Sequence, residues 1–265
     1  MAKNKWDAQD YAKHSSAQWK WAEELIHKLQ LNGTEHVLDI GCGDGKISAA
    51  LAQKLEMGSI TGVDASPEMI ALAQKEFNID LWPNLDFKVM DAADIRLDKK
   101  YDIAFSNATL HWVADHGAVL AGINACLNPN GKILLQMGGA GNAQAMIDIV
   151  TECIDTSGWS DYFTGFEFPY YFYAVADYQN WLPQHGFIAD RVELLAKDMQ
   201  HEGIDGLKGW LRTTWFPYTD RLPDHLKELF LDEIVSVYLK KFPVDTHGKT
   251  HVRMVRLEVE ATKCK

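Results

Sequence analysis

Two carboxylates accompany three closely spaced glycines in the segment His36–Lys46. Asp39 stands two residues before Gly41, the glycines follow the spacing G-x-G-x-G, and Asp44 lies inside the loop. The segment begins as an apolar run, which predicts a buried strand, and Ile47–Leu55 then predicts a helix. Glycines between a strand and a helix permit a tight turn where a side chain would collide with a ligand. The pattern predicts a ligand site in a Rossmann-like sheet, outside the carboxyl end of the strand.

Another carboxylate, Asp64, ends the next apolar run, Ser59–Val63. An acid at this strand end is placed to accept two hydrogen bonds from ribose hydroxyls. A dinucleotide site would space its glycines as G-x-G-x-x-G, so that a pyrophosphate sits on the helix N-terminus. Here the spacing differs, and Asp39 and Asp44 would repel a pyrophosphate. The same two acids suit a ligand that carries an ammonium and a sulfonium.

The first half of the chain alternates strand patterns with helix patterns. Apolar runs predict strands at 36–40, 59–63, 85–90, 101–106 and 132–137. Helices are predicted between them, and one opens with Ser66 as its cap and Pro67 in its first turn. Five strands joined by right-handed helical crossovers form a parallel, doubly wound sheet.

Composition limits the possible partners. The 265 residues include 26 Lys and Arg against 37 Asp and Glu, a net charge of −11, and the basic residues form no run. This balance disfavours nucleic acid and anionic membranes as partners. The four cysteines are scattered without a C-x-x-C pair, which argues against a metal site and fits a reducing compartment. No signal peptide or membrane-spanning run is visible, so we expect a cytoplasmic enzyme.

The glycine loop and its acids resemble motif I of the class I S-adenosylmethionine-dependent methyltransferases. Three further segments narrow the resemblance. They are Trp6-Asp-Ala-Gln-Asp-Tyr11 with Ser16-Ala-Gln18, Phe105-Ser-Asn-Ala-Thr-Leu-His-Trp112, and Leu127-Asn-Pro-Asn-Gly131. Together they are similar to the trans-aconitate and juvenile-hormone-acid methyltransferase group, whose members esterify small carboxylic acids. The similarity covers the first half of the chain.

The resemblance implies a Rossmann-like, doubly wound, mainly parallel seven-stranded α/β sheet with an antiparallel edge hairpin. Val192–Ala196 and Val252–Ala261 have strand character and would supply the hairpin. We expect one methyltransferase domain over residues 1–265. Its parts would be a cofactor-binding core with an N-terminal lid at 1–138, aromatic cap insertions at 139–190 and 197–250, and an edge strand at 251–262.

The family motifs assign site residues one by one, with S-adenosyl-L-methionine as the cofactor. The methionine end would be lined by Asp39, Gly41, Cys42 and Gly43, the ribose by Asp64, the adenine by Ala65 and Met69, the adenine N6 edge by Asp91 and Ala92, and the sulfonium by Asn107. By the same resemblance, Gln18 and Trp112 would hold the substrate carboxylate through side-chain N–H donors.

Neutral donors suit a carboxylate nucleophile. A carboxylate with a pKa of about 4 is ionised at neutral pH and needs no base. The main task of the protein is then to align the nucleophile with the methyl group. Ser106-Asn-Ala-Thr109 follows the fourth predicted strand, where many amino-directed methyltransferases carry Asn/Asp-Pro-Pro-Tyr. We therefore expect methylation of a carboxylate oxygen of a small organic acid, which gives a methyl ester.

Other interpretations remain open for the acceptor. His111 would be the base if the acceptor were a carbon, nitrogen or hydroxyl oxygen of a metabolite. A module that binds S-adenosylmethionine without turnover is a further alternative, as is a nicotinamide oxidoreductase. His111 and Trp112 also fit a structural role at a strand end, and Gln18 fits a helix cap or a cofactor contact. The oligomeric state is not predicted.

Three arginines are candidates to bind a second carboxylate of the substrate, since Arg holds such groups bidentately. They are Arg212, Arg253 and Arg256. The alternation of side chains along a strand directs only one of Arg253 and Arg256 toward a pocket. Surface ion pairing in an acidic protein is the simpler interpretation of all three.

Overall fold

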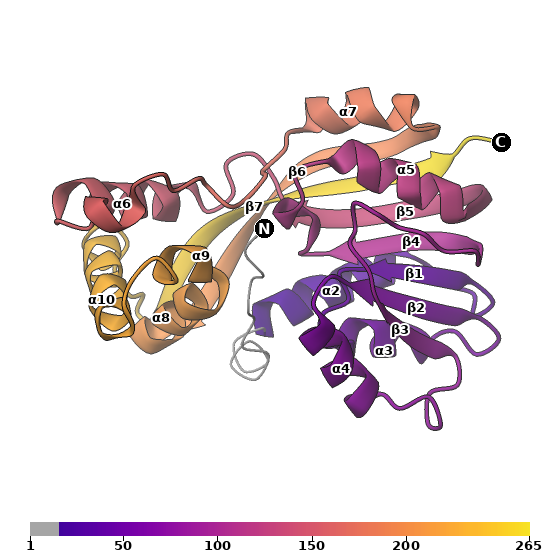
Figure 1. Cartoon of the computed structure of the whole chain (residues 1–265), viewed down its shortest axis with the longest axis horizontal. Coiled ribbons are helices and arrows are strands. Elements are labelled where there is room, and N and C mark those ends of the chain that lie inside the picture. Colours follow the sequence, from indigo (N-terminus) through magenta and orange to yellow (C-terminus); the bar gives the residue numbers. More distant parts are fainter. Residues whose placement is uncertain (1–15) are drawn as a thin grey trace. The chain divides into compact units, whose positions relative to one another are not determined.

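The computed structural model describes residues 16–265, with side chains from residue 21 onward, so the Trp6–Tyr11 motif lies outside the described part. These residues divide into two compact units (Figure 1). The core unit comprises 18–140, 170–195 and 256–265, and the helical unit comprises 141–169 and 196–255. Each unit is described by itself below.

The core unit is built on a twisted sheet of seven strands (Figure 1). The strands are β1 (His36–Ile40), β2 (Ser59–Asp64), β3 (Leu85–Val89), β4 (Tyr101–Asn107), β5 (Leu127–Gly138), β6 (Phe187–Glu202) and β7 (Lys249–Lys263). β6 belongs to the core unit up to residue 195, and β7 belongs to it from residue 256. The strand order is β3-β2-β1-β4-β5-β7-β6. β1 to β5 pair in parallel, and β7 runs antiparallel to β5. The predicted Rossmann-like, mainly parallel sheet with an antiparallel edge is confirmed, and the carboxyl ends of its parallel strands share one edge.

Helices cover both faces of this sheet because its central strands are buried on both sides. They are α2 (Ser16–Lys28), α3 (Lys46–Ala52), α4 (Pro67–Glu76), α5 (His116–Cys126) and α7 (Val175–Gln184), with a short 3-10 turn, η1 (Leu110–Trp112). On one face, Leu25 of α2 packs in the same cluster as Val37 of β1. On the other, Val119 of α5 packs with Leu38 of β1.

Local sequence signals set the ends of two of these helices. Ser66 caps α4, since its Oγ accepts a hydrogen bond from the Met69 amide at 3.2 Å, and Pro67 begins the helix as predicted. Asp115 caps α5 in the same way through the Ala118 amide at 2.9 Å. That cap starts α5 at His116.

The helical unit holds α6 (Gln144–Thr156), η2 (Ser160–Phe163), α8 (Gly203–Thr214), α9 (Phe216–Thr219) and α10 (Asp224–Lys241). α10 packs against both α6 and α8. Aromatic rings form the centre of this unit: Phe163 lies 5.6 Å from Phe230 and 6.1 Å from Tyr218, measured between ring centroids.

Two strands and two helices differ from the sequence-based expectation. β6 extends to both sides of the predicted Val192–Ala196, and β7 is likewise longer than Val252–Ala261. β6 is an edge strand with few buried residues, so its sequence lacks the apolar alternation that marks a strand. The sequence also did not predict α7 and α8. Within the described residues, none of the helices is both long and apolar enough to cross a bilayer.

Candidate functional site

Asp39 lies at the carboxyl edge of the sheet, near the end of β1, and is 2% exposed. Its Oδ2 accepts a hydrogen bond from Ser48 Oγ of α3 at 2.5 Å. Burial away from water, with a further contribution from the nearby Asp64 charge, raises the pKa of Asp39 to about 7. A cation placed beside Asp39 would stabilise its ionised form.

The loop after β1 is fastened to β2 by its backbone. The amides of Gly41 and Cys42 both donate to the carbonyl oxygen of Val63, at 2.7 and 3.0 Å. The side chain of Cys42 is buried, and burial raises its thiol pKa, so Cys42 is a neutral packing residue. In the other direction, Thr109 Oγ1 donates to the carbonyl oxygen of Gly41 at 3.0 Å. The loop is therefore held between β2 and the residues that follow β4.

The three glycines of this loop all have positive φ angles, yet for different reasons. A Cβ on Gly41 would lie 2.0 Å from Thr109 Cγ2, and one on Gly45 would lie 2.6 Å from the Phe87 ring. A Cβ on Gly43 would meet no protein atom within 4 Å. The expectation that all three glycines leave space for a ligand is therefore wrong at Gly41 and Gly45, where neighbouring side chains of the protein need the space. The open side of the loop is at Gly43.

Asp64 ends β2 opposite this loop. Its Oδ2 accepts a hydrogen bond from the Gly43 amide at 3.0 Å, and its Oδ1 accepts one from the Ser66 amide at 2.9 Å. Burial raises the pKa of Asp64, and the two amide hydrogen bonds partly oppose that shift. Because each carboxylate oxygen can accept a second hydrogen bond, Asp64 keeps acceptor capacity for hydroxyl groups.

The residues predicted to meet an adenine lie after β2 and β3. Ala65 is exposed directly after β2, and Met69 is buried in the first turns of α4. After β3, Asp91 is exposed and Ala92 is 8% exposed. Asp91 Oδ1 accepts a hydrogen bond from the Ala93 amide at 2.9 Å, which shapes the turn. These four residues thus continue the edge that carries Asp39 and Asp64.

Asn107, the last residue of β4, is 7% exposed. Its side-chain Oδ1 is sealed from solvent and has no hydrogen-bond partner among the described residues. A buried amide oxygen without a partner is costly, and such groups in native proteins call for a ligand, ion or water. Asn107 is the clearest sign of a missing ligand group at the sheet edge.

His111 and Trp112 lie in η1, just after β4. The Gly138 amide donates a hydrogen bond to His111 Nδ1 at 3.4 Å. Burial, the positive charge of Arg256 and the neighbouring His116 lower the pKa of His111 to about 3. His111 is therefore uncharged at neutral pH, and its Nδ1 lone pair is already engaged.

An aromatic wall stands beside these residues, made of His111, Trp112, Tyr170 and Phe172. Tyr170 and Phe172 stack with centroids 5.5 Å apart and planes 5° apart, and Trp112 lies 4.7 Å from Tyr170. Tyr170 and Phe172 fall within the predicted aromatic cap insertion at 139–190, and they alternate along the backbone and so face the same side. That alternation was the signal that could have found them.

The remaining predicted residues are placed as follows. Gln18 belongs to α2, but its side chain lies outside the described part of the structure. Arg256 is 4% exposed and its guanidinium lies 5.5 Å from the centre of the Trp21 ring of α2. Arg253 is exposed, so the two strand arginines differ as their alternation predicts. Arg212 pairs with Glu228 on the surface of the helical unit at 3.0 Å.

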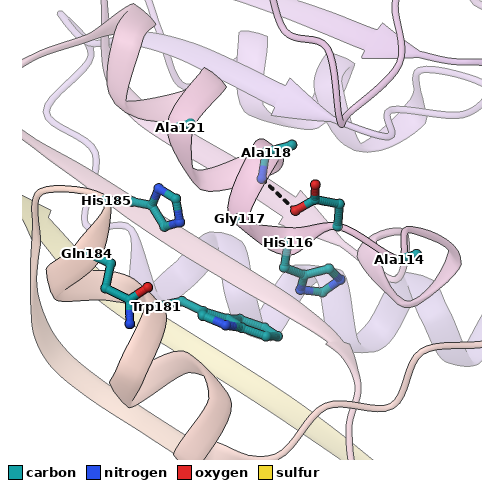
Figure 2. Close-up of a pocket in the computed structure, with 9 residues that line it drawn as sticks. Ala114, His116, Gly117, Ala118, Ala121, Trp181, Gln184 and His185 are labelled. Carbon is teal, nitrogen blue, oxygen red and sulfur yellow. Dashed lines mark hydrogen bonds between the residues drawn. The ribbon is translucent and has the colours of Figure 1, made fainter.

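A separate cavity of about 470 Å³ opens between the first turn of α5 and the end of α7 (Figure 2). Its lining is Ala114, Asp115, His116, Gly117, Ala118, Ala121, Trp181, Gln184 and His185. None of the predicted site residues lines it, and His116 is already bonded to Tyr178 Oη and the Leu110 carbonyl oxygen. Across residues 16–265, His, Cys, Asp and Glu side chains form no group suited to hold a metal ion.

Comparisons with known proteins agree with this geometry. A methyltransferase domain model matches residues 37–131, from β1 into β5. Trans-aconitate 2-methyltransferase of Agrobacterium fabrum is 28% identical over 97% of this chain and 99% of its own length. These matches support a class I S-adenosylmethionine-dependent methyltransferase related to the trans-aconitate group. An uncharacterised methyltransferase of Schizosaccharomyces pombe is 27% identical over 74% of this chain and 76% of its own.

Solved structures share the methyltransferase fold. The YcgJ protein of Bacillus subtilis superposes with a TM-score of 0.63 at 14% identity, covering 93% of this chain and 99% of that one. Phosphoethanolamine N-methyltransferase 2 of Haemonchus contortus, solved with S-adenosylhomocysteine, gives 0.61 at 17% identity, over 97% of this methyltransferase and 57% of that chain.

The cofactor of this methyltransferase is S-adenosylmethionine, and the residues present fit it. Asp39 supplies a buried negative charge that suits an ammonium, and Asp64 keeps acceptor capacity for hydroxyls. The space beyond Gly43 is open, and the Asn107 oxygen lacks a partner. These four residues come from three strand ends and the loop between them, the place where Rossmann-like sheets bind nucleosides.

Proposed function

We propose that this methyltransferase transfers a methyl group to a carboxylate oxygen of a small organic acid and releases a methyl ester. The observation that carries the proposal is the state of His111. With a pKa of about 3 and with Nδ1 already hydrogen-bonded to the Gly138 amide, His111 is a poor base at neutral pH. An acceptor that is already ionised, such as a carboxylate, needs no base. The trans-aconitate 2-methyltransferases among the relatives support the same acceptor class.

The proposal gives each group of residues a distinct task. When bound, the cofactor supplies a methyl group on a positively charged sulfur. Asp39, Asp64 and Asn107 bind its polar groups, as their placement at the ends of β1, β2 and β4 supports. Gln18 and Trp112 orient the acceptor carboxylate with side-chain N–H donors. The aromatic wall excludes water, which strengthens the attraction between the carboxylate and the sulfonium.

The product gives the most direct test. The enzyme is incubated with labelled S-adenosylmethionine and a panel of mono-, di- and tricarboxylic acids, with the matching alcohols and amines as controls. We expect label to enter acids only and to be released as methanol by mild alkali, because esters hydrolyse under conditions that leave ethers, N-methyl and C-methyl groups intact. An alkali-stable methyl product contradicts the carboxylate assignment.

Two variants test the proposed donors. Gln18→Ala and Trp112→Phe should each lower kcat/KM by about 10- to 100-fold, as expected when a hydrogen bond to a charged group is lost. Cofactor affinity, measured by calorimetry, should stay near that of the parent. Trp159→Phe is the matched control, because it removes an indole N–H that donates to Glu233 at 2.8 Å within the helical unit. Equal kinetic effects of the two tryptophan variants contradict the donor role of Trp112.

A further inference from the structure

We propose that His111 is a third hydrogen-bond donor to the acceptor carboxylate, acting as a neutral imidazole through its Nε2–H. This inference rests on the proposed function, because it assumes that the acceptor is an anion. It assigns to His111 a task opposite to that of a base: His111 gives a hydrogen bond to the nucleophile and takes no proton from it.

The hydrogen bond from Gly138 fixes the tautomer. A backbone amide can only donate, so the Nδ1 atom that lies 3.4 Å from the Gly138 nitrogen must be the unprotonated, accepting nitrogen. A neutral imidazole carries one proton, and with Nδ1 accepting, that proton is on Nε2. Gly138 is the last residue of β5, so the main chain of the sheet itself sets which side of the ring donates.

The surroundings of the ring keep it neutral. Arg256 of β7 pairs in register with Gly138, and its positive charge opposes protonation of the imidazole. His116 of α5 acts in the same direction, and the aromatic side chains of Tyr170 and Phe172 supply no negative charge. These groups and burial together explain why the His111 pKa falls to about 3.

The Nε2 atom is open to a ligand. It makes no hydrogen bond within the described residues, and it is not among their polar atoms that are sealed from solvent without a partner. The ring lies in the aromatic wall, with its centroid 5.8 Å from Trp112 and 6.0 Å from Phe172. A polar N–H at the surface of an otherwise apolar wall gives one fixed contact point for a ligand acceptor atom.

The charge state suits an anionic nucleophile. An imidazolium would pair with the carboxylate and lower its nucleophilicity, whereas a neutral N–H orients the carboxylate and leaves its charge in place. Arg256 is buried, its charge acts on His111, and the same positive field favours an anion over a neutral acceptor. The donor from His111 and the field from Arg256 therefore select the same class of substrate.

Nitrogen NMR of the full-length enzyme bound to S-adenosylhomocysteine tests this assignment without turnover. The His111 signals, identified by their loss in His111→Gln, should show the Nε2–H tautomer and remain those of a neutral ring from pH 8 down to about pH 4.5. A proton on Nδ1, or titration near the usual histidine pKa, overturns the proposal. The tautomer and the titration are read from the parent protein, and His111→Gln serves only to identify the signals.

Activity of paired variants tests the contact with the acceptor. His111→Phe keeps a ring but loses the donor, and kcat/KM should fall by about 10- to 100-fold with unchanged cofactor affinity. His111→Gln replaces Nε2–H with an amide N–H and should recover a large part of that loss. Tyr171→Phe, an exposed change in the neighbouring segment, is the control. A His111→Phe enzyme with parental kcat/KM, or a His111→Gln enzyme as impaired as His111→Phe, overturns the donor role.

Different results overturn the carboxylate assignment and the donor role of His111. An alkali-stable product overturns the proposed function whatever His111 does. An alkali-labile ester formed at the parental rate by His111→Phe overturns only the donor role and leaves the carboxylate assignment intact.

Discussion

Single charged groups in the two units differ in what shifts their pKa values. In the helical unit, Arg212 and Lys208 hold the pKa of Glu228 at about 2 on the surface. In the core unit, burial raises the pKa of Asp39 to about 7 and lowers that of His111 to about 3. Paired surface charges satisfy each other, whereas buried charges with too few partners are costly to the fold. The difference indicates where a ligand completes the structure.

A second contrast concerns the polar atoms themselves. His251 of the helical unit lies between two carboxylates, Asp198 at 2.8 Å and Asp245 at 3.0 Å, and is thereby fully paired. Asn107 of the core unit, by contrast, has a sealed oxygen with no partner among the described residues. A ligand group that donates a hydrogen bond is therefore expected at Asn107 in the core unit.

The largest expected effect is that of Asp39→Asn on the cofactor-free enzyme. The folded-state pKa of Asp39 lies above its unfolded value, so stability falls as pH rises from about 4 through about 7. A shift of about three pKa units corresponds to about 4 kcal/mol, and Asp39→Asn should gain stability of this order at pH 8. Asn keeps an acceptor for Ser48. Denaturant unfolding at pH 5 and pH 8 measures the change.

The same variant should bind S-adenosylmethionine more weakly at pH 8. Parental affinity should fall as pH drops below about 7, because protonated Asp39 no longer attracts a cation, and the affinity of Asp39→Asn should lack this dependence. If the variant gains no stability and its cofactor affinity depends on pH as that of the parent does, burial does not raise the pKa of Asp39. The contrast between the two units is then wrong for Asp39.

Gly43→Val should distinguish the effect of filling the cofactor's space from the effect of backbone strain. The branched side chain enters the open space next to Asp64, so Kd for S-adenosylmethionine should rise by about 100-fold or more. The free energy of unfolding should fall by only about 1–3 kcal/mol, the cost of a side chain at a positive φ. Gly158→Val is the matched control, since Gly158 of the helical unit also has a positive φ and no atom within 4 Å of its Cβ position. It should lose similar stability and no affinity. Equal affinity in the two variants would place the cofactor elsewhere.

Glu228→Gln should have the smallest effect. The lowered pKa of Glu228 contributes stability above its unfolded pKa of about 4.5, and this contribution is lost as pH falls from there through about 2. Because the side chain is 54% exposed, solvent screening limits the loss at pH 7 to less than about 1 kcal/mol. Thermal unfolding at low and high salt measures it, and salt should remove most of the difference. A large, salt-independent loss would mean that the helical unit also depends on buried charge.

The sequence predicted the parts of the fold that rest on strong local patterns. β1, β2 and β4 are buried apolar runs with a polar residue at or next to the end, so their bounds followed to within one residue. The full length of β6 was not predicted, because an edge strand needs no apolar alternation. Its extent depends on its pairing with β7. Pairing between distant segments is a property of the folded chain, so the pattern within one short segment cannot predict it.

In the candidate site, too, local sequence patterns predicted some features, whereas others depend on contacts between distant segments. Asp39 and Asp64 were named by type and spacing and Asn107 by the family resemblance, and the structure places all three at one sheet edge. The charge state of His111 could not be found in this way, because it depends on an amide 27 residues later and on Arg256 of the last strand. The sequence could therefore name His111 only as a base or a structural residue.

The burial of Asp39 has a consequence for the thermodynamics of cofactor loading. A carboxyl group with a pKa of about 7 is half protonated near neutrality, and binding of a cation beside it drives the remaining protons into solution. Loading should then release a fraction of a proton per cofactor, and the heat of binding should change with the ionisation enthalpy of the buffer. Because S-adenosylmethionine and its demethylated product carry the same ammonium, exchange of one for the other is proton-neutral. Acidification would therefore slow the filling of an empty enzyme while leaving product exchange on a filled enzyme untouched.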